Sequence, residues 1–139
     1  MSAASNYLEN KVLDHVLTAT GYTQPGTRYL ALFTNTSSNA AANLEAGTLT
    51  DEVTTSSSAY ARKSVTFAAA SGGSSATNAT VTFDTATASW GSITHIAVMD
   101  GATAGAGNVL FWGAVTTAKT IDTGDTFQVT SGNLTIALA

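Results

Sequence analysis

The chain has 139 residues, enough for one domain with a hydrophobic core of its own. Only 10% of the residues are charged, against about 25% in typical soluble proteins, and the net charge is −4. The five basic residues are scattered, which argues against nucleic-acid binding, and the lack of cysteine excludes disulfides and thiolate metal sites. We therefore expect one domain over residues 1–139, binding neither nucleic acid nor a membrane.

The first twenty residues predict a helix over residues 5–20. Asn6 and Glu9 have the spacing of a capping box, and Gly21 is a stop signal. Apolar side chains recur at four-residue spacing, which is typical of an amphipathic helix. They are Leu8, Val12 and Val16, with Leu13 and Leu17 beside them.

Residues 28–139 predict β-structure, because short apolar or alternating runs are separated by turn signals. We expect Val109–Val115 to be a central strand buried on both faces, Gly101–Gly107 a hairpin loop, and Ser131–Asn133 a tight hairpin. The predicted fold is mainly β: an antiparallel, jelly-roll-like β-sandwich of about seven to nine short strands with one N-terminal amphipathic helix. The predicted strands are Arg28–Thr34, Tyr60–Ala68, Ala79–Phe83, Ile93–Met99, Val109–Val115, Lys119–Asp122, Thr126–Thr130 and Leu134–Leu138.

The longest irregular region of the sequence is residues 35–58. Loops of this length are uncommon inside compact domains and are often functional. We interpret it as a surface excursion that reaches a neighbouring subunit.

Candidate chemistry is sparse, so we expect neither an enzyme nor a bound cofactor or metal. His15 and His95 lack metal-site spacing, and no serine stands in a GxSxG elbow. Calcium prefers oxygen ligands, which Asp84, Asp122 and Asp125 could supply. A role in turns is the better explanation of these aspartates. A glycan hydrolase needs a pair of catalytic carboxylates. No two acidic residues of this sequence stand out as such a pair, because turn roles explain them equally well.

Two tryptophans allow a core or a glycan-platform interpretation. Trp112 lies inside an apolar strand and is expected in the core. Trp90 precedes Gly91 after a Thr/Ala/Ser loop, which also allows partial exposure and the platform interpretation. Core or interface packing is the favoured role for both.

Several segments in a fixed order resemble small bacteriophage structural proteins of the tail-fibre-like or virion type. The resemblance spans nearly the whole chain and brings no catalytic residues with it. The segments are Ser5–Lys11, Leu13–His15, Tyr29–Thr34, Tyr60–Arg62, Val65–Phe67, Ala88–Gly91, Thr94–His95, Val109–Gly113 and Thr123–Asp125.

This resemblance implies a virion component. No repeat or heptad pattern of a fibre shaft is present. The leading hypothesis is therefore a capsid decoration (cement) protein on the outer surface of the head. It would bind the major capsid protein and itself, as a homotrimer or a dimer. The alternative is a tail- or fibre-associated structural or receptor-binding module.

A weakly charged surface is cheap to desolvate against a partner, as at the centres of interfaces. The long loop and the helix are the expected contact regions, together with two arginines that we expect to be exposed. The candidate interface residues are Tyr7, Leu8, Lys11, Arg28, Arg62 and Trp90.

Overall fold

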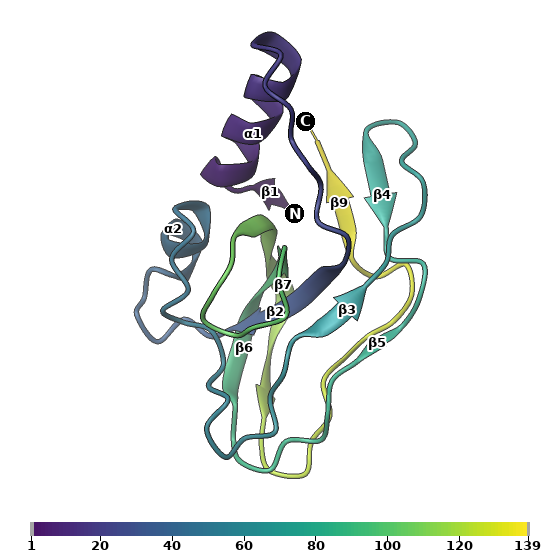
Figure 1. The fold of residues 1–139 in the computed structure, drawn as a ribbon. Coiled ribbons are helices and arrows are strands. Elements are labelled where there is room, and N and C mark those ends of the chain that lie inside the picture. The colour runs from purple at the N-terminus through teal and green to yellow at the C-terminus, as the bar shows by residue number, and fades with distance from the viewer. Residues whose placement is uncertain (1, 139) are drawn as a thin grey trace.

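The computed structural model describes residues 2–138 as a mainly antiparallel, sandwich-like β-fold with α1 near its N-terminus (Figure 1). The predicted fold class is confirmed, and the short helix α2 is an addition to it. In chain order the elements are β1 (Ala3–Ala4), α1 (Asn6–Leu17), β2 (Arg28–Phe33), α2 (Ala40–Glu45), β3 (Lys63–Val65), β4 (Ser74–Ala76), β5 (Val81–Thr82), β6 (Gly91–Met99), β7 (Val109–Ile121), β8 (Gln128–Val129) and β9 (Thr135–Ala137).

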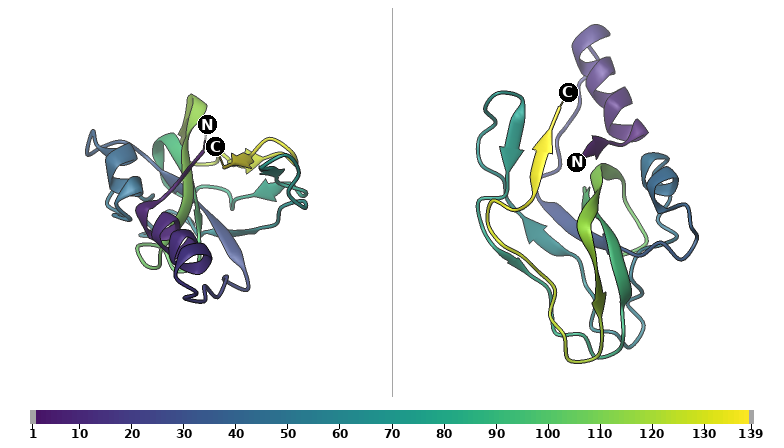
Figure 2. Two further views of the ribbon diagram at one scale, coloured as in Figure 1. Left: turned by 90° about the horizontal axis from the view of Figure 1, so that it is seen from above. Right: turned by 180° about the vertical axis from the view of Figure 1, so that it is seen from behind.

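The larger layer is a five-stranded sheet in the order β1–β7–β6–β2–β3. β6 and β7 form its long hairpin, in which Gly91 faces Ile121 and Met99 faces Val109. The predicted hairpin loop Gly101–Gly107 joins these two strands. α1 and both ends of the described chain lie toward one end of the molecule, and the β5–β6 and β7–β8 connections lie at the other (Figures 1 and 2).

The opposing layer consists of two narrow ribbons, β4–β9 and β5–β8. The last two strands thus pair with different partners: Ile136 lies opposite Ser75, and Val129 lies opposite Val81. The prediction that Ser131–Asn133 closes a hairpin between them is therefore wrong. Instead, that segment is tied to the β4–β5 connection.

The hydrophobic core lies on both faces of the larger sheet at β2. Leu30 and Leu32 face the ribbons, whereas Ala31 and Phe33 face α2, and all four are essentially inaccessible to solvent. Side chains alternate between the faces of a strand, so a strand covered on both faces has a continuous apolar sequence.

β7 differs from its prediction in two ways. It runs without interruption through residues 116–120, which joins the two strands predicted at Val109–Val115 and Lys119–Asp122. Only Val109 and Leu110 are buried within its first seven residues, so two-sided burial is wrong there. The reason is the opposing layer: two ribbons are too narrow to cover every strand of a five-stranded sheet.

α1 is confirmed as a helix, but its ends differ from the prediction. Ser5, rather than Asn6, is the N-cap, because its hydroxyl accepts the N–H of Leu8 at 3.3 Å. The helix ends before residue 20 because the chain leaves the helical conformation after its C-cap, Thr18, whose N–H and hydroxyl donate to the Asp14 carbonyl. Ala19 then takes a positive φ of 57°.

The predicted long loop over residues 35–58 is not one irregular excursion. It contains α2, whose Leu44 is completely buried. Asp51 is only 3% exposed and accepts hydrogen bonds from Thr36, Ser37 and Asn43. A single carboxylate therefore holds the segment compact. The polar composition of residues 35–58 does not reveal this, because it is a tertiary effect.

Candidate interaction surfaces

The first turn of α1 is firmly anchored to the larger sheet. Ser5 is fully buried, its N–H donates to the Leu110 carbonyl at 3.0 Å, and its hydroxyl donates to the Val109 carbonyl. Leu8 packs into the core at 7% exposure. Leu8, predicted as a contact residue, therefore fixes the helix rather than offering free surface.

The rest of α1 and the return segment, residues 9–27 together, form what we call the α1 arm. Its four large apolar residues are well exposed: Val12 at 42%, Leu13 at 54%, Val16 at 71% and Leu17 at 73%. The apolar half of the predicted amphipathic helix is thus presented to solvent, beyond the body of the domain (Figure 1). Isolated exposed leucines are ordinary, but a contiguous apolar strip indicates an interaction site.

Tyr7 and Lys11 lie together on the side of α1 away from this strip. Both are half-buried, and the Lys11 ammonium lies 5.8 Å from the centre of the Tyr7 ring. A cation over an aromatic face at this distance is weakly attractive. These two predicted contact residues therefore partner each other within the subunit.

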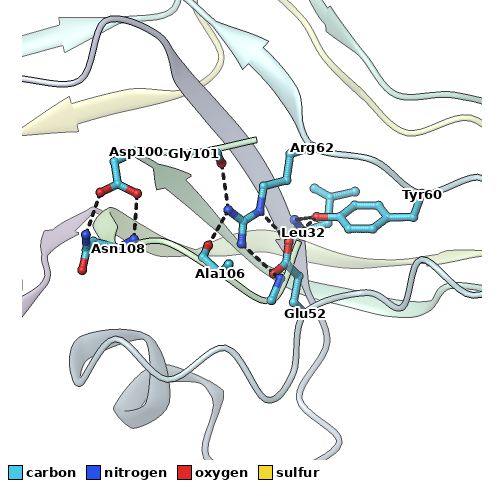
Figure 3. A network of polar contacts seen from close by, with 9 residues as sticks. Leu32, Glu52, Tyr60, Arg62, Asp100, Gly101, Ala106 and Asn108 are labelled. Atoms are coloured by element: carbon cyan, nitrogen blue, oxygen red, sulfur yellow. Dashed lines mark hydrogen bonds and ion pairs between the residues drawn. The ribbon is translucent and has the colours of Figure 1, made fainter. Parts of the chain in front are cut away.

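Arg62 is buried, so the expectation that it is exposed is wrong. Its guanidinium pairs with both oxygens of Glu52, each at 2.8 Å. The remaining nitrogen donates to the carbonyls of Gly101 at 2.8 Å and Ala106 at 2.9 Å (Figure 3). An arginine with five donors can be satisfied in the interior in this way, and it ties the β6–β7 loop to the core.

Glu52 links this pair to two further groups. It accepts the Gly105 N–H at 2.8 Å and the Tyr60 hydroxyl at 3.0 Å, and that hydroxyl accepts the Leu32 N–H at 3.0 Å (Figure 3). Burial, reinforced by the Glu52 charge, raises the pKa of Tyr60, which keeps it a neutral donor. We call Glu52, Tyr60, Arg62 and the β6–β7 loop the Arg62 network.

The β6–β7 loop is also closed from within. Asp100 accepts the backbone N–H and the side-chain amide of Asn108, both at 2.7 Å (Figure 3). Gly107 has a φ of 82°, and a Cβ there would lie 2.6 Å from the Asp100 carboxylate. Only glycine suits this position, so the loop conformation is specified locally as well as by Arg62.

Trp90 is a core residue, which agrees with the favoured interpretation, and the partial exposure that a glycan platform needs is not found. It is 4% exposed, its indole donates to the Ser58 carbonyl at 2.8 Å, and its ring meets Tyr60 and Phe83 edge-on. Trp112, expected in the core, is only half-buried and donates to Glu45 of α2 at 2.9 Å. Trp90 is therefore unavailable as a glycan platform.

Arg28 is half-buried at the start of β2 and donates to the Pro25 carbonyl at 3.0 Å. It lines a cleft of about 430 Å³ between the larger sheet and the β4–β9 ribbon. Leu110, Phe111 and Leu138 give this cleft an apolar lining. A second cleft, of about 330 Å³, flanks the other side of β9 along β7.

The histidines and the acidic side chains are dispersed rather than gathered. Within residues 2–138, no three His, Asp or Glu side chains approach closely enough to hold a metal ion. His15 accepts the Tyr22 N–H at 3.3 Å, and burial lowers the pKa of His95, partly opposed by the Asp51 charge. Asp125 accepts a backbone N–H within its own turn at 2.9 Å, which agrees with its interpretation as a turn residue. No helix described here has the length and apolarity needed to cross a membrane.

The six predicted contact residues therefore divide into two groups. Tyr7, Lys11 and Arg28 keep surface near the α1 end, whereas Leu8, Arg62 and Trp90 are interior. The central members of the Arg62 network, Glu52 and Tyr60, were missed as a pair, because their partners are distant in sequence. The one available signal was Arg62, a charged residue inside a predicted strand.

Comparison with known proteins identifies the family. A family model described as podophage GP4 fiber I protein gp80 matches residues 3–137, from the start of β1 to the end of β9. A search of curated proteins finds no match. Since the family match covers almost the entire chain, this protein belongs to the podophage GP4 fiber I protein gp80 family and is a phage structural protein of the fibre type.

Proposed function

We propose that the chain is a structural subunit of a tail-associated virion fibre and that it acts by binding other virion proteins, not by catalysis. The observation that carries this proposal is the family match over residues 3–137. The exposed apolar arm supports a binding role. The first contact surface that we propose is the α1 arm, with Tyr7 and Lys11 at its base.

Capsid decoration, with the major capsid protein as partner, is the weaker proposal. The same sandwich-like fold and low charge suit a protein that clamps the shell. The family, however, is described by a fibre and not by a head. We therefore prefer a tail-associated fibre to capsid decoration, because the family match is the finding that separates these two proposals.

Copy number and location test this proposal together. Purified virions would be separated into heads and tails, and the chain quantified by mass spectrometry against the major capsid protein. A fibre subunit is expected with the tails at on the order of tens of copies, as rings of low symmetry allow. Hundreds of copies on heads would establish decoration instead, and absence from the particle would overturn both proposals.

A further inference from the structure

The end of the molecule that carries α1 holds two unfilled apolar surfaces. One is the strip on the α1 arm: Val12, Leu13, Val16 and Leu17. The other is the 430 Å³ cleft, whose rim carries Leu138 at 64% exposure. Among the described residues, the large hydrophobic side chains that remain exposed are these four and Leu138, so the whole exposed set belongs to α1 or the cleft.

The cleft is a consequence of the fold. β9 covers only part of the inner face of the larger sheet, so Leu110 and Phe111 face a gap beside it. An interior is normally packed as densely as an organic crystal, and an unfilled apolar gap forfeits those contacts. The cleft therefore favours an apolar occupant that the chain does not supply to itself in this conformation.

We propose that the apolar face of α1 from one copy seats in this cleft of a second copy, so that the chain self-associates by exchanging helices. The two surfaces are complementary in kind: one projects and the other is concave. Both lie toward one end of the same chain, so a closed symmetric pair would fill both clefts at once. This inference depends on these surfaces alone and not on the proposed function.

Charge also favours this pairing. At about 100° per residue, Glu9 falls between Val16 and Leu13 around the helix, so the apolar strip carries one carboxylate. Arg28 is the charged residue of the cleft lining. Seating the strip in the cleft brings these opposite charges to the same interface, where complementarity fixes the docking register.

Area decides between docking in the cleft and pairing of two helices. A specific interface buries about 800 Å² per partner. The 12 residues of α1 extend about 18 Å and present an apolar strip of a few hundred Å² at most. Pairing of two helices buries one strip on each partner and falls short of that size, whereas exchange buries both a strip and a cleft lining on each partner and comes closer to it.

Engineered cysteines provide the direct test, because the natural chain contains none. Full-length Val16→Cys and Ala70→Cys proteins, carrying different mass tags, would be mixed and oxidised mildly. Ala70 is exposed and lines the cleft, so we expect heterodimers. The matched control pairs Val16→Cys with Thr85→Cys, an exposed residue in the β5–β6 connection at the far end, and is expected to give background levels.

Each other outcome overturns the proposal. Disulfides formed only between two Val16→Cys copies would show that helices pair with helices. Background cross-linking together with a monomeric mass by light scattering would show that another protein, or nothing, fills the cleft.

A substitution on the helix gives a second, independent measurement. Leu17→Glu is expected to weaken self-association at least about tenfold in sedimentation equilibrium, because it places a charge in the apolar contact. Asp14→Glu, an exposed residue on the polar side of the same helix, is the control and is expected to change nothing. Equal association constants for Leu17→Glu and the natural chain would contradict the proposal.

Discussion

The Arg62 network and the α1 arm use side chains in opposite ways. In the network, a buried charge finds a partner for each of its three nitrogens and holds segments from residues 32, 52, 62 and 100–108 together. In the arm, four large apolar side chains face solvent beyond one anchored turn. Rigidity in this chain therefore comes from satisfied polar groups, while the surface available for binding is apolar.

The largest expected effect comes from breaking the network. Glu52→Ala would leave the Arg62 guanidinium buried without its counter-charge, and we expect a loss of about 3–5 kcal/mol in the free energy of unfolding. Urea denaturation measures it. The control is Asp84→Ala, which removes the more exposed Lys63–Asp84 pair and should cost at most about 1 kcal/mol. Equal losses would show that the network is not the source of rigidity.

The second-largest loss of stability is expected from the aromatic packing beside the Arg62 network. Trp90→Phe removes the indole donor to Ser58 and part of a fully packed ring, with an expected cost of about 2 kcal/mol. Thermal unfolding measures the change. The half-buried Trp112, replaced by Phe in the same way, should lose less, and a reversed order would contradict the burial argument.

The anchor of the α1 arm is Ser5, which joins the arm to the larger sheet. Ser5→Ala removes the N-cap of α1, and we expect a cost of about 1 kcal/mol. Hydrogen exchange should speed up at the α1 amides and stay unchanged in β2. Thr18→Ala, at the exposed end of the helix, is the control with the smaller expected effect.

Acid should loosen the segment around α2. Burial acts to raise the pKa of Asp51, but the hydrogen bonds from Ser37, Thr36 and Asn43 outweigh it and hold that pKa below its usual value. The carboxylate therefore stabilises the folded chain above the unfolded pKa of about 3.9, and this stability disappears as the pH falls through the lower folded value. Asp51→Asn should flatten the stability curve in that acidic range, and an unchanged curve would contradict the assignment.

The smallest effect on stability is expected on the arm itself. Leu17→Ser should change the free energy of unfolding by no more than about 0.5 kcal/mol, since Leu17 is 73% exposed. Denaturation of dilute protein, where association is negligible, measures it. A large loss would mean that the strip packs within the subunit after all.

Local patterns predicted the elements that depend on neighbours in sequence. The α1 helix follows from its four-residue spacing, and β5 follows from the alternation of buried Val81 and Phe83 with exposed Thr82. The β6–β7 hairpin loop follows from its glycines, of which Gly107 has a positive φ. Each of these depends on backbone geometry within a few residues, which the sequence contains directly.

The β-class, the helix and the family resemblance can be predicted from the sequence, because periodicity and composition act locally along the chain. The interior positions of Arg62 and Trp90, and the pairing of the last two strands with different ribbons, depend on contacts between distant segments. Arg62 meets Glu52 and carbonyls 39 and 44 residues away, and no local pattern encodes such a partner. The same holds for the exposed face of α1: amphipathicity predicts an apolar side, but only the path of the helix, which projects beyond the body of the domain after its first turn, leaves that side uncovered.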